Sequence, residues 1–141
     1  MVSDRIDIDF VILADWAQVV AGKLYLQGGG WDTLTAQSFP HQQNIAVAVG
    51  LKVPWGATNQ KYTVTINVVN EDTQAGLIRL EGQLESGRPP GIAPGADQLV
   101  TMALNSAGAI PSAGSYLVTA SINGEERRRK AFRVLEQGRR P

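Results

Sequence analysis

Residues 110–136 read IPSAGSYLVTASINGEERRRKAFRVLE, and this stretch decides the fold. Apolar and polar residues alternate on both sides of the dipeptide Asn123-Gly124. Such alternation is typical of a half-buried strand, and Asn-Gly is the strongest short signal for a two-residue β-hairpin. We therefore predict strands over residues 115–122 and 128–135, joined by a tight turn.

The residues that precede this hairpin indicate a particular corner. Pro111, Gly114 and Tyr116 have the spacing found ahead of the late strands of immunoglobulin-like sandwiches, where a tyrosine ring packs at the corner. We expect Tyr116 to pack in the same way here.

A period of two continues along most of the chain. We predict a bend at residues 14–16, a tight turn at Ala21-Gly22 and a polar connection over residues 33–44. A helix over residues 10–21 is the competing interpretation, because alanine and leucine favour helices. The expected fold is all-β: an antiparallel two-sheet β-sandwich, immunoglobulin-like, with about eight short strands. The other expected strands cover residues 6–13, 17–20, 23–27, 45–53, 62–68, 77–86 and 99–104.

The length and composition fit a single domain. The chain has 141 residues, of which 43% are hydrophobic, so it can bury a core without a disulfide or a metal. We predict one β-sandwich domain over residues 1–137 and a frayed C-terminal tail over residues 138–141.

Charge and targeting signals narrow the class of protein. Lys plus Arg and Asp plus Glu both number 13, whereas a nucleic-acid or anionic-membrane binder usually has a positive excess. There is no cysteine, and Met1–Asp7 is acidic where a signal peptide is basic. No apolar run approaches the ~20 residues of a spanning helix. We expect a cytoplasmic protein that binds neither nucleic acid nor membrane.

Three consecutive glycines, Gly28, Gly29 and Gly30, precede Trp31 and Asp32. A phosphate-binding loop would need these glycines to open a helix, followed by Lys and Ser or Thr, and the sequence has neither feature. The favoured interpretation is a bulge or bend at a strand end, which turns the tryptophan into the core.

The tryptophans are the other candidates for a ligand site, because each flanks a glycine or a turn. Tryptophans at loop ends could form a stacking platform for a sugar or a peptide aromatic. The alternative, which we favour, is that each caps an end of the core. Arg88 in a Pro-rich loop could hold a carboxylate. The candidate ligand-binding residues are Trp16, Gly28, Gly29, Gly30, Trp31, Asp32, Trp55 and Arg88.

Signals for catalysis or metal binding are weak. His41 is the only histidine, and no G-x-S-x-G motif accompanies it. Asp7 and Asp9 share a strand face, where a solvated edge is a better interpretation than a carboxylate pair. Residues 127–130 alternate faces on a strand, so they favour a charged edge over a phosphate track. We expect no catalytic residue, no metal site and no cofactor.

Three blocks of sequence carry a family resemblance: ADWAQVVAGKLYLQGGGWD at residues 14–32, VAVGLKVPWGATN at residues 47–59 and GRPPG at residues 87–91. They resemble a bacterial, mainly actinobacterial, family of stand-alone domains of unknown function. The resemblance implies a β-rich domain and assigns no catalytic residue.

Two functional hypotheses follow. Ala46, Ala48 and Gly50 form a small-residue second face on one strand, where another layer or a neighbouring chain could approach closely. This pattern and the absence of catalytic motifs favour a non-enzymatic interaction or assembly module, with a protein partner or a second copy of the chain. The alternative is a small-ligand binder, with carbohydrate as one candidate ligand, that uses the tryptophans near the glycines.

Overall fold

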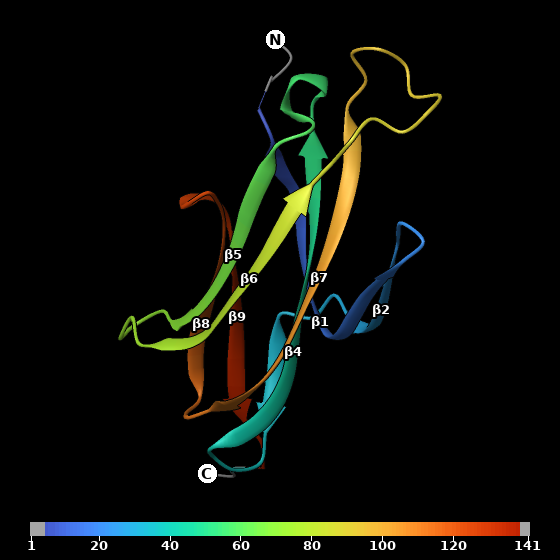
Figure 1. Cartoon of the computed structure of the whole chain (residues 1–141). Helices are drawn as coiled ribbons and strands as arrows, with labels where there is room; N and C mark the ends of the chain where they lie inside the picture. The colour runs from blue at the N-terminus through green and yellow to red at the C-terminus, as the bar shows by residue number, and fades with distance from the viewer. Residues whose placement is uncertain (1–4, 139–141) are drawn as a thin grey trace.

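The computed structural model describes residues 5–138, which form two packed β-sheets (Figure 1). One sheet has the strand order β2-β1-β4-β7 and the other β3-β9-β8-β5-β6. The described residues contain no α-helix, so the all-β prediction is confirmed and the helix over residues 10–21 is excluded. The strands are β1 (Asp7–Val20), β2 (Lys23–Gly29), β3 (Thr33–Ala36), β4 (His41–Val53), β5 (Lys61–Asn70), β6 (Gly76–Glu85), β7 (Gln98–Ile110), β8 (Gly114–Ile122) and β9 (Glu125–Glu136), with a 3-10 turn at Trp55–Ala57.

The core lies between the two sheets and follows from the alternation in the sequence. One face of β4 is fully buried there, from Ile45 to Val53, and it packs against the inward residues of β5 and β8. The two-sheet sandwich is therefore confirmed, with nine strands in place of about eight. Pairing is antiparallel except between β3 and β9, which run parallel.

The last hairpin forms as predicted. Asn123 and Gly124 have φ of 50° and 83°, the positive values that a type I′ turn requires. Tyr116 is 1% exposed, stacks on Phe132 and donates a hydrogen bond of 2.7 Å from its hydroxyl to the Ser112 carbonyl. The tyrosine corner is confirmed, while the wider likeness to immunoglobulin domains stays a prediction.

The chain does change direction near residues 14–16, but the predicted break between two strands there is wrong, and so is the predicted polar connection over all of residues 33–44. β1 continues through the bend because it changes partners at Ala14, which pairs with Ala46 of β4 and with Gly29 of β2. The connection contains β3 and the first residues of β4. In the predicted tail, residues 139–141 lie outside the described part of the chain.

After Ala14, β1 and β2 form a two-stranded ribbon over residues 14–29, which we call the projecting hairpin. Figure 1 shows it bent away from the first half of β1. Its base lies on the outer face of the first sheet, where Ala14, Ala17, Ala46 and Ala48 form a fully buried cluster. Asn105 of β7 fixes the contact by accepting a hydrogen bond from Ala17 N (3.0 Å) and donating one to Ala17 O (2.7 Å). The chain itself therefore covers the small-residue face of β4.

The basic residues 127–130, which we call the basic cluster, join the two sheets at one edge of the sandwich. Arg127 donates to the Ile6 carbonyl (2.6 Å), and Arg128 donates to the Ile8 carbonyl (3.0 Å). These bonds satisfy one carbonyl just before β1 and one in its first half, which has no strand neighbour on that side among the described residues. The sequence predicted only a charged edge for residues 127–130. In the structure, two of these arginines also link the two sheets.

The turn of the projecting hairpin carries a local conflict. Ala21 and Gly22 have φ of 50° and 74°, as in a type I′ turn, but alanine adopts positive φ reluctantly. We expect Ala21→Asn to raise the free energy of unfolding by about 0.5–1 kcal/mol in urea denaturation. Ala113→Asn, at an exposed position without positive φ, should change it by less than about 0.5 kcal/mol. Equal effects at both positions would contradict this assignment.

Candidate functional site

The projecting hairpin carries most of the exposed apolar surface. Among the described residues, seven large hydrophobic side chains are exposed, and five of them lie on this hairpin. Isolated exposed apolar residues are ordinary, whereas a contiguous group on one element marks an interaction site. The five are Trp16, Val19, Val20, Tyr25 and Leu26, and the other two are Leu99 and Leu135.

The cross-strand register sorts these side chains onto two faces. Trp16 pairs with Gln27 and Gln18 pairs with Tyr25, so aromatic and amide side chains share one face. The indole Nε1 of Trp16 lies 3.4 Å from Gln18 Oε1, as a long hydrogen bond. These four residues and Leu26 line a hollow of ≈ 420 Å³. This face combines stacking surface with donors and acceptors.

A second hollow, of ≈ 370 Å³, separates the hairpin from β7. Trp16 and Val19 line it on the hairpin side, and Met102 and Asn105 line it on the side of β7. Trp16 therefore stands between two hollows, and it is 48% exposed.

The outer edge of β2 is open. Within residues 5–138, β2 pairs only with β1, and Lys23 is its only charged residue. Proteins usually protect such an edge with charge, proline, a bulge or a covering segment. At the other edges, β6 and β7 lie against each other, and β3 has only four residues. Among these edges, the edge of β2 is the one suited to a further strand.

The glycine triplet lies at the base of the hairpin. Gly28 and Gly30 have φ of 57° and 86°, and Gly30 N donates to the Leu13 carbonyl at 2.8 Å. This sharp path returns the chain to the core, where the Trp31 ring meets Phe132 edge to face at 5.7 Å. The predicted bend is therefore present. Trp31 packs in the core and does not share the exposed face of Trp16.

Trp55 and Arg88 form a separate contact in the loops at the end of the sandwich where the chain starts. The Arg88 guanidinium lies 3.8 Å from the centre of the Trp55 ring. It also donates to the Trp55 carbonyl (2.7 Å) and to Thr58 Oγ1 (2.8 Å). This arginine holds the 3-10 turn in place, and two of its three guanidinium nitrogens donate hydrogen bonds within the chain.

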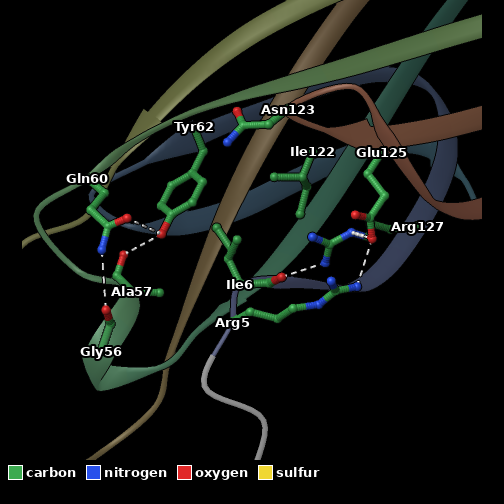
Figure 2. Close-up of a pocket in the computed structure, with 10 residues that line it drawn as sticks. All are labelled: Arg5, Ile6, Gly56, Ala57, Gln60, Tyr62, Ile122, Asn123, Glu125 and Arg127. Atoms are coloured by element: carbon green, nitrogen blue, oxygen red, sulfur yellow. Dashed lines mark hydrogen bonds and ion pairs between the residues drawn. The ribbon is translucent and has the colours of Figure 1, made fainter.

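A hollow of ≈ 360 Å³ lies at the same end of the sandwich, and Figure 2 shows its lining. Glu125 lies between two arginines, 2.8 Å from Arg5 Nη2 and 3.1 Å from Arg127 Nε. Tyr62 donates to the Ala57 carbonyl at 2.9 Å. Most of the charged and polar groups around this hollow have partners within the chain, and the buried Arg127 Nε has the Glu125 carboxylate as an ion-pair partner but makes no hydrogen bond among the described residues.

The remaining candidates lie apart from each other. Asp32 accepts a hydrogen bond from the Thr33 hydroxyl, at 2.9 Å, just ahead of β3. His41 lies 3.1 Å from Gln43 Oε1, and Asp7 accepts hydrogen bonds from Ile8 N (2.8 Å) and Arg127 (3.3 Å). Across residues 5–138, no group of three or more His, Cys, Asp or Glu is placed to hold a metal ion.

The same part of the chain has no helix that is long and apolar enough to span a bilayer.

Sequence reasoning named one residue of the exposed cluster, Trp16, and missed Val19, Val20, Tyr25 and Leu26. The missed signal was present in residues 16–27, where large apolar residues occupy both faces of two consecutive short strands and Lys23 is the only charge. Large apolar residues on both faces of a ribbon are buried only when both faces are covered, and five of these side chains stay exposed here.

Comparison with known proteins gives one result. No curated protein matches the chain. The family described as "Family of unknown function (DUF6941)" matches residues 9–135, which is nearly the whole chain. The match includes the projecting hairpin, the glycine triplet and the last strand pair. The chain therefore belongs to this family of unknown function, DUF6941.

Proposed function

We propose that the protein is a non-enzymatic interaction module that binds another protein chain through the projecting hairpin. One observation carries the proposal: five of the seven exposed large hydrophobic side chains gather on a ribbon whose outer edge is unpaired among the described residues. Association would bury these side chains and would also give hydrogen-bond partners to the backbone N–H and C=O groups at the open edge of β2.

The chemistry of the surface supports protein binding. Interfaces are enriched in tryptophan, tyrosine and other large apolar residues and are depleted in charge at their centres. Trp16 and Tyr25 supply rigid aromatic area, and Val20 and Leu26 extend it. Asp15 and Lys23 are the only charged residues of the hairpin.

A pair of matched double variants tests the proposal. Trp16→Ser with Tyr25→Ser removes two exposed aromatic residues from the hairpin, and Leu99→Ser with Leu135→Ser removes two exposed apolar residues from elsewhere. We expect the hairpin variant to weaken association at least about 30-fold, which corresponds to the loss of about 2 kcal/mol, the contribution of one of the two aromatic residues if it is central to the interface. Sedimentation velocity and affinity capture from the native cells measure the association.

The control variant should associate like the wild-type chain, and both variants should keep the wild-type circular dichroism. A folded hairpin variant with undiminished association would overturn the proposal. A greater loss of association in the control variant than in the hairpin variant would place the binding surface around Leu99 or Leu135 instead.

A second candidate function rests on a different observation, the aromatic and amide face around the ≈ 420 Å³ hollow. Trp16 and Tyr25 with Gln18 and Gln27 could stack on and hydrogen-bond to a sugar. Titration of tryptophan fluorescence with a glycan panel, in the wild-type chain and in Trp16→Phe, would detect it. A shift lost in Trp16→Phe would support this candidate, and no shift would exclude it for the glycans used.

Two narrower expectations stay predictions of the sequence. They are the bacterial, mainly actinobacterial, distribution of the family and the cytoplasmic location of the protein.

A further inference from the structure

The turn of the projecting hairpin determines which backbone groups of β2 face outward. In a two-residue hairpin, the residues that flank the turn form a hydrogen-bonded pair, and the pairs then alternate. Val20 and Lys23 flank the turn, so Ala17 belongs to a pair that is not hydrogen-bonded. Its N–H and C=O should point outward from the ribbon, and both bond to the Asn105 side chain.

The same alternation applies to the other strand of the ribbon. Leu24 and Leu26 pair with Val19 and Ala17, so their N–H and C=O groups point to the open edge of β2. Gly28, with φ of 57°, ends the regular part of this edge. A short strand segment centred on Tyr25 is therefore presented for pairing.

We propose that this edge pairs with the same edge of a second copy of the chain, antiparallel and centred on Tyr25. The inference rests on the proposed function, and it names the partner and the register. A twofold axis at Tyr25 places Leu24 opposite Leu26 of the second copy. Both residues then donate and accept a hydrogen bond, so each outward group between the turn and Gly28 is satisfied.

The charges on β2 fit this register. Lys23 faces Gln27 of the second copy, and the two lysines are offset by roughly 13 Å along the strands. The edge is otherwise uncharged, so two copies meet without the repulsion that normally prevents edge-to-edge pairing. A strongly charged partner would find no complementary charge on it.

The side chains fit the register as well. Tyr25 is 54% exposed and would face its own copy across the axis, at the close Cβ spacing of a pair that is not hydrogen-bonded. Trp16 lies on the same face, across the hairpin from Gln27. The two aromatic and amide faces would form one continuous surface over the joined sheets.

Single cysteines test the register, because the chain has no cysteine of its own. A pair that is not hydrogen-bonded has a Cβ spacing of about 4.5–5.5 Å, close to what a disulfide spans. We expect Tyr25→Cys to form a disulfide-linked dimer under mild oxidation at least tenfold faster than Leu99→Cys, at a position that is slightly more exposed (59% against 54%). Non-reducing gel electrophoresis measures both rates.

A mixed experiment keeps the tyrosine in place. Lys23→Cys and Gln27→Cys should each cross-link poorly with itself, but a mixture of the two should give the cross-linked heterodimer. Light scattering of the wild-type chain should show a dimer whose fraction rises with concentration. Lys23→Cys that cross-links with itself as fast as with Gln27→Cys would overturn the register.

The failure of this inference can be told from the failure of the proposed function. A wild-type chain that stays monomeric at its highest soluble concentration, with equal cross-linking by Tyr25→Cys and Leu99→Cys, would overturn self-pairing. If such a chain still captured another protein and lost it in the Trp16→Ser, Tyr25→Ser variant, the proposed function would stand. If capture also survived in that variant, both would fall.

Discussion

Replacing Phe132 with alanine is expected to lower the free energy of unfolding by about 3–5 kcal/mol. The ring is 2% exposed and contacts two other aromatic rings, stacking on Tyr116 at 5.4 Å and meeting Trp31 edge to face at 5.7 Å. Its loss leaves a cavity at the point where the last hairpin and the glycine bend meet. Urea denaturation followed by circular dichroism measures the change.

Leu135→Ala is the control for this prediction. Leu135 lies three residues further along β9, and its side chain is 49% exposed. Its truncation should cost less than about 0.5 kcal/mol. A loss below about 1 kcal/mol for Phe132→Ala would mean that the aromatic group is not part of the stabilising core.

Replacing Gly28 with valine is expected to be the second most damaging of the changes considered. Valine would take a φ of 57°, which costs about 1–3 kcal/mol for a branched residue. Its Cβ would also lie 2.9 Å from Asp15 Cγ, across the base of the hairpin. Gly29 is more tolerant, because its φ is ordinary and its nearest contact would be Leu26 Cδ1 at 3.2 Å.

Two further variants separate the causes at Gly28. Gly76→Val has free space and an ordinary φ, so it should change stability by less than about 0.5 kcal/mol. Asp15→Ala combined with Gly28→Val should recover the part of the loss that comes from the clash. The glycines would become candidates for a ligand loop again if Gly28→Val folded with wild-type stability but lost association.

Local signals in the sequence predicted the second half of the fold well. The β8–β9 hairpin depends on Asn123-Gly124, whose conformational preference acts within a few residues. The Tyr116 corner depends on a hydrogen bond to a residue only four positions away. The buried face of β4 follows from unbroken alternation. In each case the decisive interaction is short in sequence or repeated along one strand.

The features that the sequence did not predict depend on distant partners. β1 continues through residues 14–16 because it exchanges β4 for β2 at Ala14, and no local pattern encodes that exchange. β3 is polar and short, and it exists because β9 offers it a parallel edge. Local propensity therefore indicated a bend and a connection where the structure has strands.

The candidate site was predicted only in part, for a similar reason. The three tryptophans have the same kind of flanking residues in the sequence but lie in different places. Trp16 is on the exposed hairpin, Trp31 packs against the core, and Trp55 lies under the Arg88 guanidinium. Which tryptophan is exposed depends on what packs over it from elsewhere in the chain. Tyr25 was missed because the sequence predicts a strand over residues 23–27 but does not show which face of that strand stays uncovered.

Amide hydrogen exchange tests most directly the central claim that the edge of β2 is the binding surface. The account predicts rapid exchange at Leu24 and Leu26 in dilute protein, since these amides point outward from an unpaired edge. In associated protein the new protection should be concentrated at residues 16–27. Protection that appears elsewhere while Leu24 and Leu26 continue to exchange rapidly would contradict it.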